Sequence, residues 1–397
     1  MALDFQQVYA KIKEIGASVQ QRKKTLEERR AKARTLLNLY ADVLDVLRDK
    51  VESAKVSDPT LRCALPLKER LDSHFPPPDL PLSATLVAAD GSQINPDRHG
   101  PVQFGLVNVG AIIMQLNSGQ ATEIKTDSYL LFEEELFTAS HNLRSDAMIA
   151  LDRDLKERAK LGELAKNYPP PVITFTDGPI ELWGVRDGED AATYQKSLEE
   201  YLTVLDDLQT SGVTTAGYVD KPGADLVVRL LELIEATPEQ IKKLREYHPL
   251  RGVSDRWLFG EKSDSLLKPG ERSAVFGIQS KLERYYKDGL SLCFFYLNAG
   301  IQGHPWPVRV EIPGWVAEDA DKLGMLHAVL VAQCRMMGAK PYPYLLHRAH
   351  ESAVVSLEER KQVEQMLLAE LRRNDAEIDD GSNKQATHTL PGRRGYK

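Results

Sequence analysis

Two short stretches share a pattern that can position catalytic carboxylates. Residues 85–93 read T-L-V-A-A-D-G-S-Q, and residues 172–179 read V-I-T-F-T-D-G-P. In each, an apolar run typical of a buried strand is followed by an aspartate and then by a glycine that turns easily. A single Asp-Gly pair is usually a hairpin turn. The two together predict that Asp90 and Asp177 stand at strand ends and converge on one site.

Two converging carboxylates suit a hard divalent cation. Mg²⁺ and Mn²⁺ prefer oxygen ligands and keep several water molecules when they bind to proteins. Paired ions of this kind activate water and stabilise the leaving oxygen of a phosphodiester. Asp90 and Asp177 are therefore predicted metal ligands, and acid-base chemistry is the alternative role for them.

A third carboxylate is expected from the segment before the second aspartate, which is predicted to be helical. Glu157 lies in R-D-L-K-E, four residues after Arg153, so the two share a helical face. An exposed ion pair between them is the alternative explanation of this spacing. The other acids considered for the third position are Asp152, Asp154, Glu163 and the run 133–135.

A late histidine completes the candidate site. Residues 341–350 read P-Y-P-Y-L-L-H-R-A-H and lead into a helix predicted over 351–373, with His350 at its start. Tyr342 and Tyr344 are predicted to lie in an extended, Pro-rich segment. A histidine beside a metal-carboxylate site can bind the ion or exchange protons near neutral pH. A structural role is the alternative. His347 lies three residues earlier, but no cysteine or third histidine is near, which disfavours zinc.

Two basic residues are candidates for phosphate contacts. Lys221 follows a predicted strand and Arg309 occupies another, and either can meet a phosphate or form an ordinary ion pair. Trp306 and Trp315 flank the second of these strands. Core packing is favoured for both indoles over base stacking.

Composition limits the class of protein. The chain has 397 residues, 42% hydrophobic and 27% charged, with net charge −7. This is typical of a globular protein that is not broadly basic, so any DNA contact would have to use a local basic groove. The three cysteines are distant from one another and form no C-x-x-C pair, which indicates a reducing compartment. Without a signal core or a run of ~18 apolar residues, the sequence predicts a cytoplasmic protein with no membrane span.

The order of elements predicts the fold class, which is α/β with a ribonuclease H-like core. Three strands joined by short turns suggest an antiparallel meander, and helices then alternate with strands. A doubly wound sheet would alternate from the start. The predicted strands are 84–89, 102–116, 121–126, 172–176 and 213–219, and the predicted helices are 142–166, 190–210 and 224–234.

The rest of the chain is predicted to flank this core. Residues 1–55 have apolar residues at helical spacing, and the Pro run 76–78 places a domain boundary near residue 80. The predicted domains are a helical or coiled-coil region 1–80, a domain 81–373 that holds the ribonuclease H-like core, and a disordered tail 374–397. Within 81–373, we expect a helical insertion at 235–290, strands at 290–297 and 308–312, and helices at 317–337 and 351–373.

The chain resembles the NurA nuclease family in its bacterial form. The resemblance rests on V-A-A-D-G-S-Q, F-T-D-G-P-I-E-L, A-G-Y-V-D-K-P, V-R-V-E-I-P-G-W-V-A and Y-P-Y-L-L-H-R-A-H, in this order over residues 84–370. It implies a ribonuclease H-like fold and a manganese-dependent DNA nuclease, exonuclease or endonuclease. It also implies a ring-like homodimer that docks on a hexameric HerA-type ATPase and resects DNA ends for recombinational repair.

The resemblance also implies the active-site residues. The family's two strand-end aspartates fall on Asp90 and Asp177, its helix glutamate on Glu157, and its late tyrosine and histidine on Tyr342 and His350. His350 would bind the metal or act as acid-base, and Tyr342 would orient the substrate. The sequence departs from the family in having P-I after the second Asp-Gly, where S-L is more usual, and in its long N-terminal helical region.

Two other functions remain open at this stage. One is a non-catalytic scaffold that grips DNA or caps a translocase ring, which the long N-terminal helices and acidic composition would fit. The other is an RNA-directed nuclease, because the fold is shared and these residues do not distinguish a reader of the 2′-OH from a DNA reader.

Overall fold

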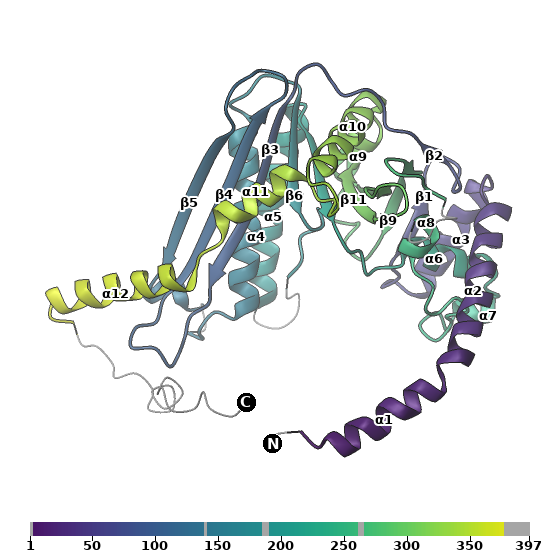
Figure 1. Ribbon diagram of the computed structural model, residues 1–397, viewed down its shortest axis with the longest axis horizontal. Helices are drawn as coiled ribbons and strands as arrows, with labels where there is room; N and C mark the ends of the chain where they lie inside the picture. Colours follow the sequence, from purple (N-terminus) through teal and green to yellow (C-terminus); the bar gives the residue numbers. More distant parts are fainter. Residues whose placement is uncertain (1–2, 139–140, 185–189, 261–265, 377–397) are drawn as a thin grey trace. The chain divides into compact units, whose positions relative to one another are not determined.

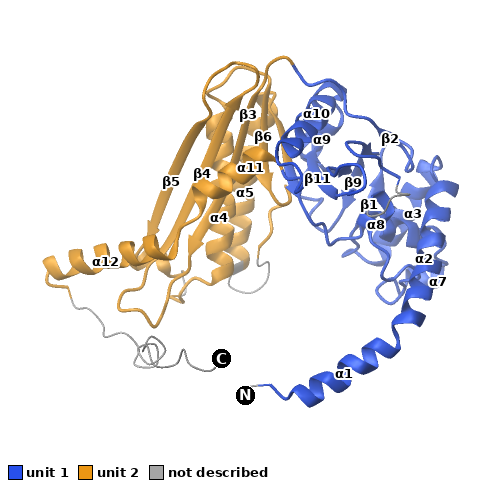
Figure 2. Cartoon of the chain, in the orientation of Figure 1, with its two compact units in different colours: residues 1–81, 217–342 blue, residues 82–216, 343–397 orange. Residues whose placement is uncertain are grey.

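The computed structural model describes residues 3–138, 141–184, 190–260 and 266–376. The chain divides into two compact units, each assembled from two separate segments (Figure 2). The first unit combines Met1–Pro81 with Gly217–Tyr342, and the second combines Leu82–Ala216 with Pro343–Lys397. The division into 1–80, 81–373 and 374–397 stays a prediction, and residues 377–397 of the expected tail lie outside the described part.

The second unit is built on a mixed sheet. β3 (Thr85–Ile94), β4 (Gly105–Gln115) and β5 (Glu123–Leu131) form an antiparallel meander. β6 (Val172–Asp177) then pairs parallel to β3, and β7 (Thr214–Val219) follows β6 in the strand order. The meander followed by a parallel strand confirms the predicted ribonuclease H-like core.

Strand β3 is longer than the sequence pattern predicted. It continues through Asp90 and Gly91 to Ile94, because antiparallel pairing with β4 extends from Thr85↔Gln115 to Ile94↔Leu106. The prediction that Asp90 ends its strand is therefore wrong. The parallel pairing with β6, however, stops at Ala89↔Thr176. Asp90 is thus interior to β3 but lies just beyond the β6 ladder.

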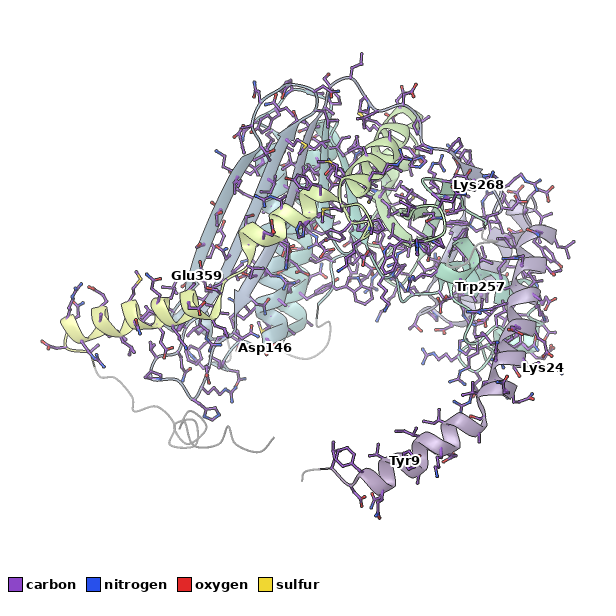
Figure 3. The ribbon with its side chains drawn as sticks, viewed as in Figure 1. Tyr9, Lys24, Asp146, Trp257, Lys268 and Glu359 are labelled. Carbon is purple, nitrogen blue, oxygen red and sulfur yellow. The ribbon has the colours of Figure 1, made fainter. Side chains whose placement is uncertain are left out.

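Helices cover both faces of this sheet (Figure 1). α4 (Asp146–Ala165) packs against β3, β4 and α5 (Asp190–Thr210). α11 (Tyr344–Ala353) crosses β3 and β4 on the other face, and α12 (Leu357–Arg373) follows it. Ser356 and Glu359 form a capping box that begins α12 (Figure 3).

Helix α11 begins at Tyr344, which was predicted to lie in an extended Pro-rich segment, and so starts before the helix predicted at 351–373. Leu345, Leu346, Ala349 and Ala353 are fully buried, and their i, i+4 spacing makes one apolar face. Pro343 is accommodated because the residue before a helix needs no backbone donor. His350 therefore lies in the last turn of α11, and the following helix begins at Leu357, six residues later than predicted.

The first unit contains a second set of antiparallel strands. β1 (Cys63–Pro66) pairs with β9 (Phe276–Gln279), β9 with β10 (Leu292–Asn298), and β10 with β11 (Pro307–Pro313). β11 also pairs with residues 217–219 of β7. The short strands β2 (His74–Phe75) and β8 (Arg272–Ser273) pair with each other.

These strands correct two predictions, because no strand was expected in the N-terminal helical region or in the helical insertion. β1 and β2 lie inside the segment 1–80, and β8 and β9 lie inside the segment 235–290. The pairings of β1 with β9 and of β2 with β8 each join residues more than a hundred positions apart, so local periodicity carries no sign of these pairings.

The N-terminal segment forms three helices in place of one long helix: α1 (Phe5–Ala17), α2 (Val19–Leu39) and α3 (Leu44–Ser57). Arg30 and Arg34 of α2 lie over the ring of Trp257 in α8 (Asp255–Phe259). Trp257 is labelled in Figure 3. The remaining helices are η1 (Glu133–Leu136), α6 (Leu226–Ile234), α7 (Pro238–Ile241), η2 (Asp288–Leu290), α9 (Gly314–Ala317) and α10 (Ala320–Met336).

Apolar side chains of β3 and all three cysteines are buried. Leu86, Val87, Ala88 and Ala89 of β3 are fully buried, and the three cysteines are buried free thiols. Across the part of the chain that the structure describes, no helix has both the length and the apolar character to cross a membrane. The cytoplasmic location stays a prediction.

Candidate active site

A cavity of about 480 Å³ opens in the second unit beside the end of the β3–β6 ladder. It brings together four of the five predicted catalytic residues: Asp90, Glu157, Asp177 and His350. The other lining residues are Gly91, Arg153, Asp154, Arg158, Pro179 and Trp183. Residues from β3, α4, β6 and α11 therefore share one concave surface.

The two aspartates come into the cavity through strand register. Ala89 and Thr176 are the last paired residues of β3 and β6, so Asp90 and Asp177 are the next residues on the two strands. Asp177 is exposed at the end of β6 and is followed by Gly178, whose φ of +90° makes the turn. Here the predicted strand-end Asp-Gly unit is confirmed by the backbone.

The acids reach the cavity from opposite faces of the sheet. Side chains alternate along a strand, and Asp90 shares its face with Ser92, whose hydroxyl donates to a carbonyl of α11. Gly91 faces the other way, toward α4. Because the β6 ladder has ended at this level, Asp90 from one face and Glu157 from the other line the same cavity.

Asp90 is held by two hydrogen bonds. Its Oδ2 lies 2.7 Å from His350 Nδ1, and its Oδ1 accepts the Gly91 N–H at 2.8 Å. An ionised carboxylate only accepts, so Nδ1 of His350 carries the proton in this pair and Nε2 remains for other chemistry. The aspartate side chain is 13% exposed and the histidine side chain 61% exposed.

Sequence reasoning missed the residues that hold α11 in place. The carbonyl of Ala353, one turn after His350, accepts from Ser92 Oγ at 2.6 Å and from Asn108 Nδ2 at 2.8 Å. A Cβ on Gly110 would lie 2.3 Å from Ser352 Oγ, so only glycine allows this close approach. Ser92 follows Asp90 by two residues, and side chains alternate along a strand, so the sequence could have indicated that the two side chains share a face.

Glu157 is buried at the α4 side of the cavity. Its Oε1 lies 3.1 Å from Arg153 Nε, so the predicted i,i+4 pair forms, but its carboxylate is enclosed and not exposed. Burial, followed by the charge of Asp154, raises the pKa of Glu157 to about 8, against the opposing influence of Arg158.

Gly91 makes room for this pair. A Cβ at this position would lie 2.6 Å from Glu157 Oε1 and 2.7 Å from Arg153 Cγ. Gly91 is in an extended strand and needs no unusual backbone angles. Its role is to let the side chains of α4 approach the strand that carries Asp90.

A family model described as the NurA domain matches residues 84–355, which is more than half of the chain. The chain belongs to the NurA family. The matched span of this NurA chain runs from the start of β3 to just after α11 and so includes every residue that lines the cavity.

Solved structures similar to this NurA chain include three nucleases. The NurA nuclease from Sulfolobus solfataricus is 13% identical, with 93% of this chain and 98% of that chain covered and a TM-score of 0.49. Human endonuclease V is 12% identical, with 71% and 85% covered and a TM-score of 0.32. Endonuclease V of Ciona intestinalis is 12% identical, with 81% and 99% covered and a TM-score of 0.31. Comparison with curated proteins finds no match.

Three predicted residues of the NurA chain belong to the first unit and do not line the described cavity. Tyr342 packs edge-on against the ring of Tyr218, with centroids 5.5 Å apart. Lys221 is exposed. Arg309 is buried, and its Nη2 lies 2.9 Å from Glu311 Oε1. Their predicted roles toward substrate stay predictions.

The remaining candidates occupy ordinary structural positions. Asp152 pairs with Lys156 and Glu163 pairs with Lys160, both outside the cavity. Trp306 is half-buried and donates to Asp220 Oδ1 at 2.8 Å, and Trp315 is half-buried as well. His347 lies 3.5 Å from Glu351 and does not line the cavity.

The donor chemistry of the cavity fits a hard divalent cation. Four carboxylates line it, from Asp90, Asp154, Glu157 and Asp177, against the two guanidinium groups of Arg153 and Arg158. Yet across the described ranges, no three acid, histidine or cysteine side chains are grouped closely enough to hold an ion. The cavity therefore holds the ligand types that a divalent cation needs, but the guanidinium group of Arg153 lies beside one of the carboxylates, that of Glu157.

Proposed function

We propose that this NurA-family chain is a nuclease that hydrolyses phosphodiester bonds in DNA and depends on Mn²⁺ or Mg²⁺. The observation that carries the proposal is the cavity shared by Asp90, Glu157, Asp177 and His350. These residues come from four different elements, and nothing in a simple structural role requires them to line one surface. Membership in the family supports the same conclusion.

The carboxylates of Asp90, Glu157 and Asp177 would hold the metal, which supplies an activated water and neutralises the phosphate when bound. The hydrogen bond from His350 Nδ1 fixes the orientation of Asp90 and leaves Nε2 to exchange a proton or bind the ion. Glu157, whose pKa is raised to about 8, gives up its proton more readily once a cation is beside it. Tyr342 is proposed to orient the substrate.

We extend the proposal to partners through the family resemblance. Single- and double-stranded DNA are the proposed substrates, with a homodimer of this chain acting with a hexameric HerA-type ATPase in end resection. The cytoplasm is the proposed location. A local basic groove must serve for DNA contact, because the whole chain carries a net charge of −7.

The decisive experiment is digestion of end-labelled single- and double-stranded DNA in Mn²⁺, Mg²⁺ or EDTA, with and without the ATPase and with a matched RNA. We expect cleavage of DNA in Mn²⁺ or Mg²⁺ and none in EDTA. Asp90→Asn should abolish cleavage without lowering the unfolding temperature. Asp152→Asn, which removes a carboxylate outside the cavity, is the control and should cleave normally. Full activity of Asp90→Asn in Mn²⁺ would remove the proposal.

A non-catalytic scaffold that binds DNA or caps a translocase remains the second candidate. It is favoured by the lack of a three-ligand group among the described side chains. The scaffold predicts DNA or ATPase binding that is identical in EDTA and in Mn²⁺, with no digestion under either condition.

A further inference from the structure

We propose that Arg153 is a built-in counter-cation that competes with a divalent metal ion for the carboxylates of the cavity. The inference rests on the proposed metal-dependent function and deepens it. It assigns Arg153 as a positioning residue that sets how strongly the cavity binds metal.

The guanidinium group of Arg153 is shared between two acids of the cavity. Its Nη2 donates to Asp154 Oδ1 at 2.7 Å, and its Nε lies 3.1 Å from Glu157 Oε1. The Glu157 side chain is 5% exposed, and Arg153 is the cation at ion-pair distance from it, while the charge of Arg158 also lowers its pKa. Asp90 contributes to the same electrostatic environment, since its charge acts on both Arg153 and Glu157.

Gly91 brings this cation next to the strand that carries Asp90. A Cβ on Gly91 would lie 2.7 Å from Cγ and 3.1 Å from Cδ of Arg153, so the arginine stem passes directly over the strand. The stem is therefore packed, whereas the side chain as a whole is 31% exposed. Arg153 can thus turn its charged end toward solvent without leaving a hole in the core.

The second arginine of the cavity is fixed differently. Arg158 is 5% exposed and donates to two backbone carbonyls, those of Asp154 at 2.9 Å and Pro179 at 2.9 Å. These bonds hold it as part of the framework. Of the two guanidinium groups, Arg153 is the one whose partners are carboxylates and whose side chain reaches solvent.

The position of Arg153 explains why four carboxylates line the cavity although no three ligand side chains among the described residues are close enough together to hold an ion. A carboxylate oxygen that is paired with a guanidinium group binds a divalent ion less tightly, because the two cations repel each other at close range. Metal binding through Oε1 of Glu157 would therefore displace the guanidinium group of Arg153, which lies 3.1 Å from that oxygen. The released guanidinium stays in the same cavity, where it can form a bidentate pair with a phosphate of the substrate.

The test is Mn²⁺ affinity of the full chain, measured by calorimetry without DNA, so that the readout is independent of activity. Arg153→Met keeps a flexible apolar stem over Gly91 and removes the charge. We expect its Kd for Mn²⁺ to fall roughly tenfold or more below that of the wild type. Arg153→Lys retains the charge and should stay within about twofold of the wild type.

Lys156→Met is the matched control. Lys156 lies on the same helix and forms the same kind of i,i+4 ion pair, with Asp152 at 2.9 Å, but does not line the cavity. Its substitution makes the same change in net charge, so it reports any long-range effect. Thermal unfolding confirms that each variant folds, and Arg153→Gln replaces Arg153→Met if that variant does not.

The outcomes separate this inference from the proposed function. A wild-type chain that binds Mn²⁺, with loss of binding in Asp90→Asn, supports the metal site. If Arg153→Met then binds no more tightly than Lys156→Met, the inference about Arg153 is overturned and the metal site stands. If the wild type and all variants bind no Mn²⁺, the proposed metal-dependent function fails and this inference fails with it.

Discussion

At the scale of single residues, the cavity depends on one enclosed carboxyl group. Glu157 is buried between α4 and the strand that carries Asp90, with Gly91 beneath it and Arg153 beside it. Burial raises its pKa from 4.5 to about 8. The folded chain therefore binds this proton more tightly than the unfolded chain, and stability is linked to pH.

The sign of that linkage gives a prediction for Glu157→Gln. A raised pKa contributes stability that is complete below pH 4.5 and is lost as pH rises through about 8. The neutral glutamine avoids this loss, so the variant should unfold at an increasingly higher temperature than the wild type across that window. The difference in the free energy of unfolding between the variant and the wild type should grow by at most about 1.4 kcal/mol per pH unit.

Thermal denaturation in EDTA from acid to mildly alkaline pH measures this effect. Glu163→Gln is the control, because Glu163 is on the same helix but its side chain is 62% exposed. Its unfolding temperature should track that of the wild type at every pH. A pH-independent difference for Glu157→Gln would contradict the buried, proton-binding state of this group.

Gly91 offers a second residue-scale prediction. In Gly91→Ala, the new Cβ would collide with Glu157 Oε1 and Arg153 Cγ at 2.6 and 2.7 Å. These side chains must shift away from Asp90, so we expect DNA cleavage to fall at least tenfold and stability to drop by about 1–3 kcal/mol. Gly105→Ala on β4, where the nearest atom would be 3.4 Å away, should change neither in digestion and urea-unfolding assays.

At the scale of elements, the position of His350 depends on how α11 is fastened to the sheet. Asn108 links three elements, because it donates to the Ala353 carbonyl of α11 and accepts from Ser128 of β5 at 2.6 Å. The residue is 8% exposed, so solvent offers little replacement for these bonds. The end of α11 is thereby held over β3 and β4.

Asn108→Ala should therefore make the position of His350 less fixed while leaving the histidine itself unchanged. We expect a loss of about 1–3 kcal/mol in urea unfolding, because the carbonyl of the buried Ala353 loses a partner. The turnover number should fall more than the affinity for DNA, since the Asp90–His350 pair is displaced. Asn117→Ala, which removes an exposed bond to the Leu82 carbonyl, is the comparison and should leave turnover unchanged.

At the scale of the whole molecule, the N-terminal helices differ in what they contribute to their unit. α1 has no buried residue. α3 packs on α6 and β1, and β1 pairs with β9. Leu47, Val51, Cys63 and Ala64 from this region are all fully buried.

Two truncations test this difference. Removal of residues 1–17 should leave the unfolding temperature within a few degrees of the full chain, because α1 buries nothing. Removal of residues 1–80 should give an insoluble or unfolded product, because it takes β1 and α3 from the core of the first unit. A soluble, cooperatively folding 81–373 fragment would restore the predicted boundary near residue 80.

The sequence by itself determined the fold class and most of the chemistry. Strand-length apolar runs, the meander followed by alternation, and the Arg153–Glu157 spacing are local patterns, and local patterns are set by backbone geometry. They pointed to Asp90, Asp177 and His350, and the family resemblance then selected Glu157 from several acids; these four residues share one cavity. The order of strands β3 to β7 followed from the same patterns, whereas β1, β2, β8 and β9 were not predicted.

Only the tertiary structure decided how those groups face one another. The continuation of β3 past Asp90, the pairing of β1 with β9 and the fastening of α11 by Asn108 all depend on partners remote in the chain. The enclosure of Glu157 over Gly91 likewise needs α4 packed on the sheet. Periodicity reports which side of an element is apolar, but burial and charge pairing arise only when that side meets its partner.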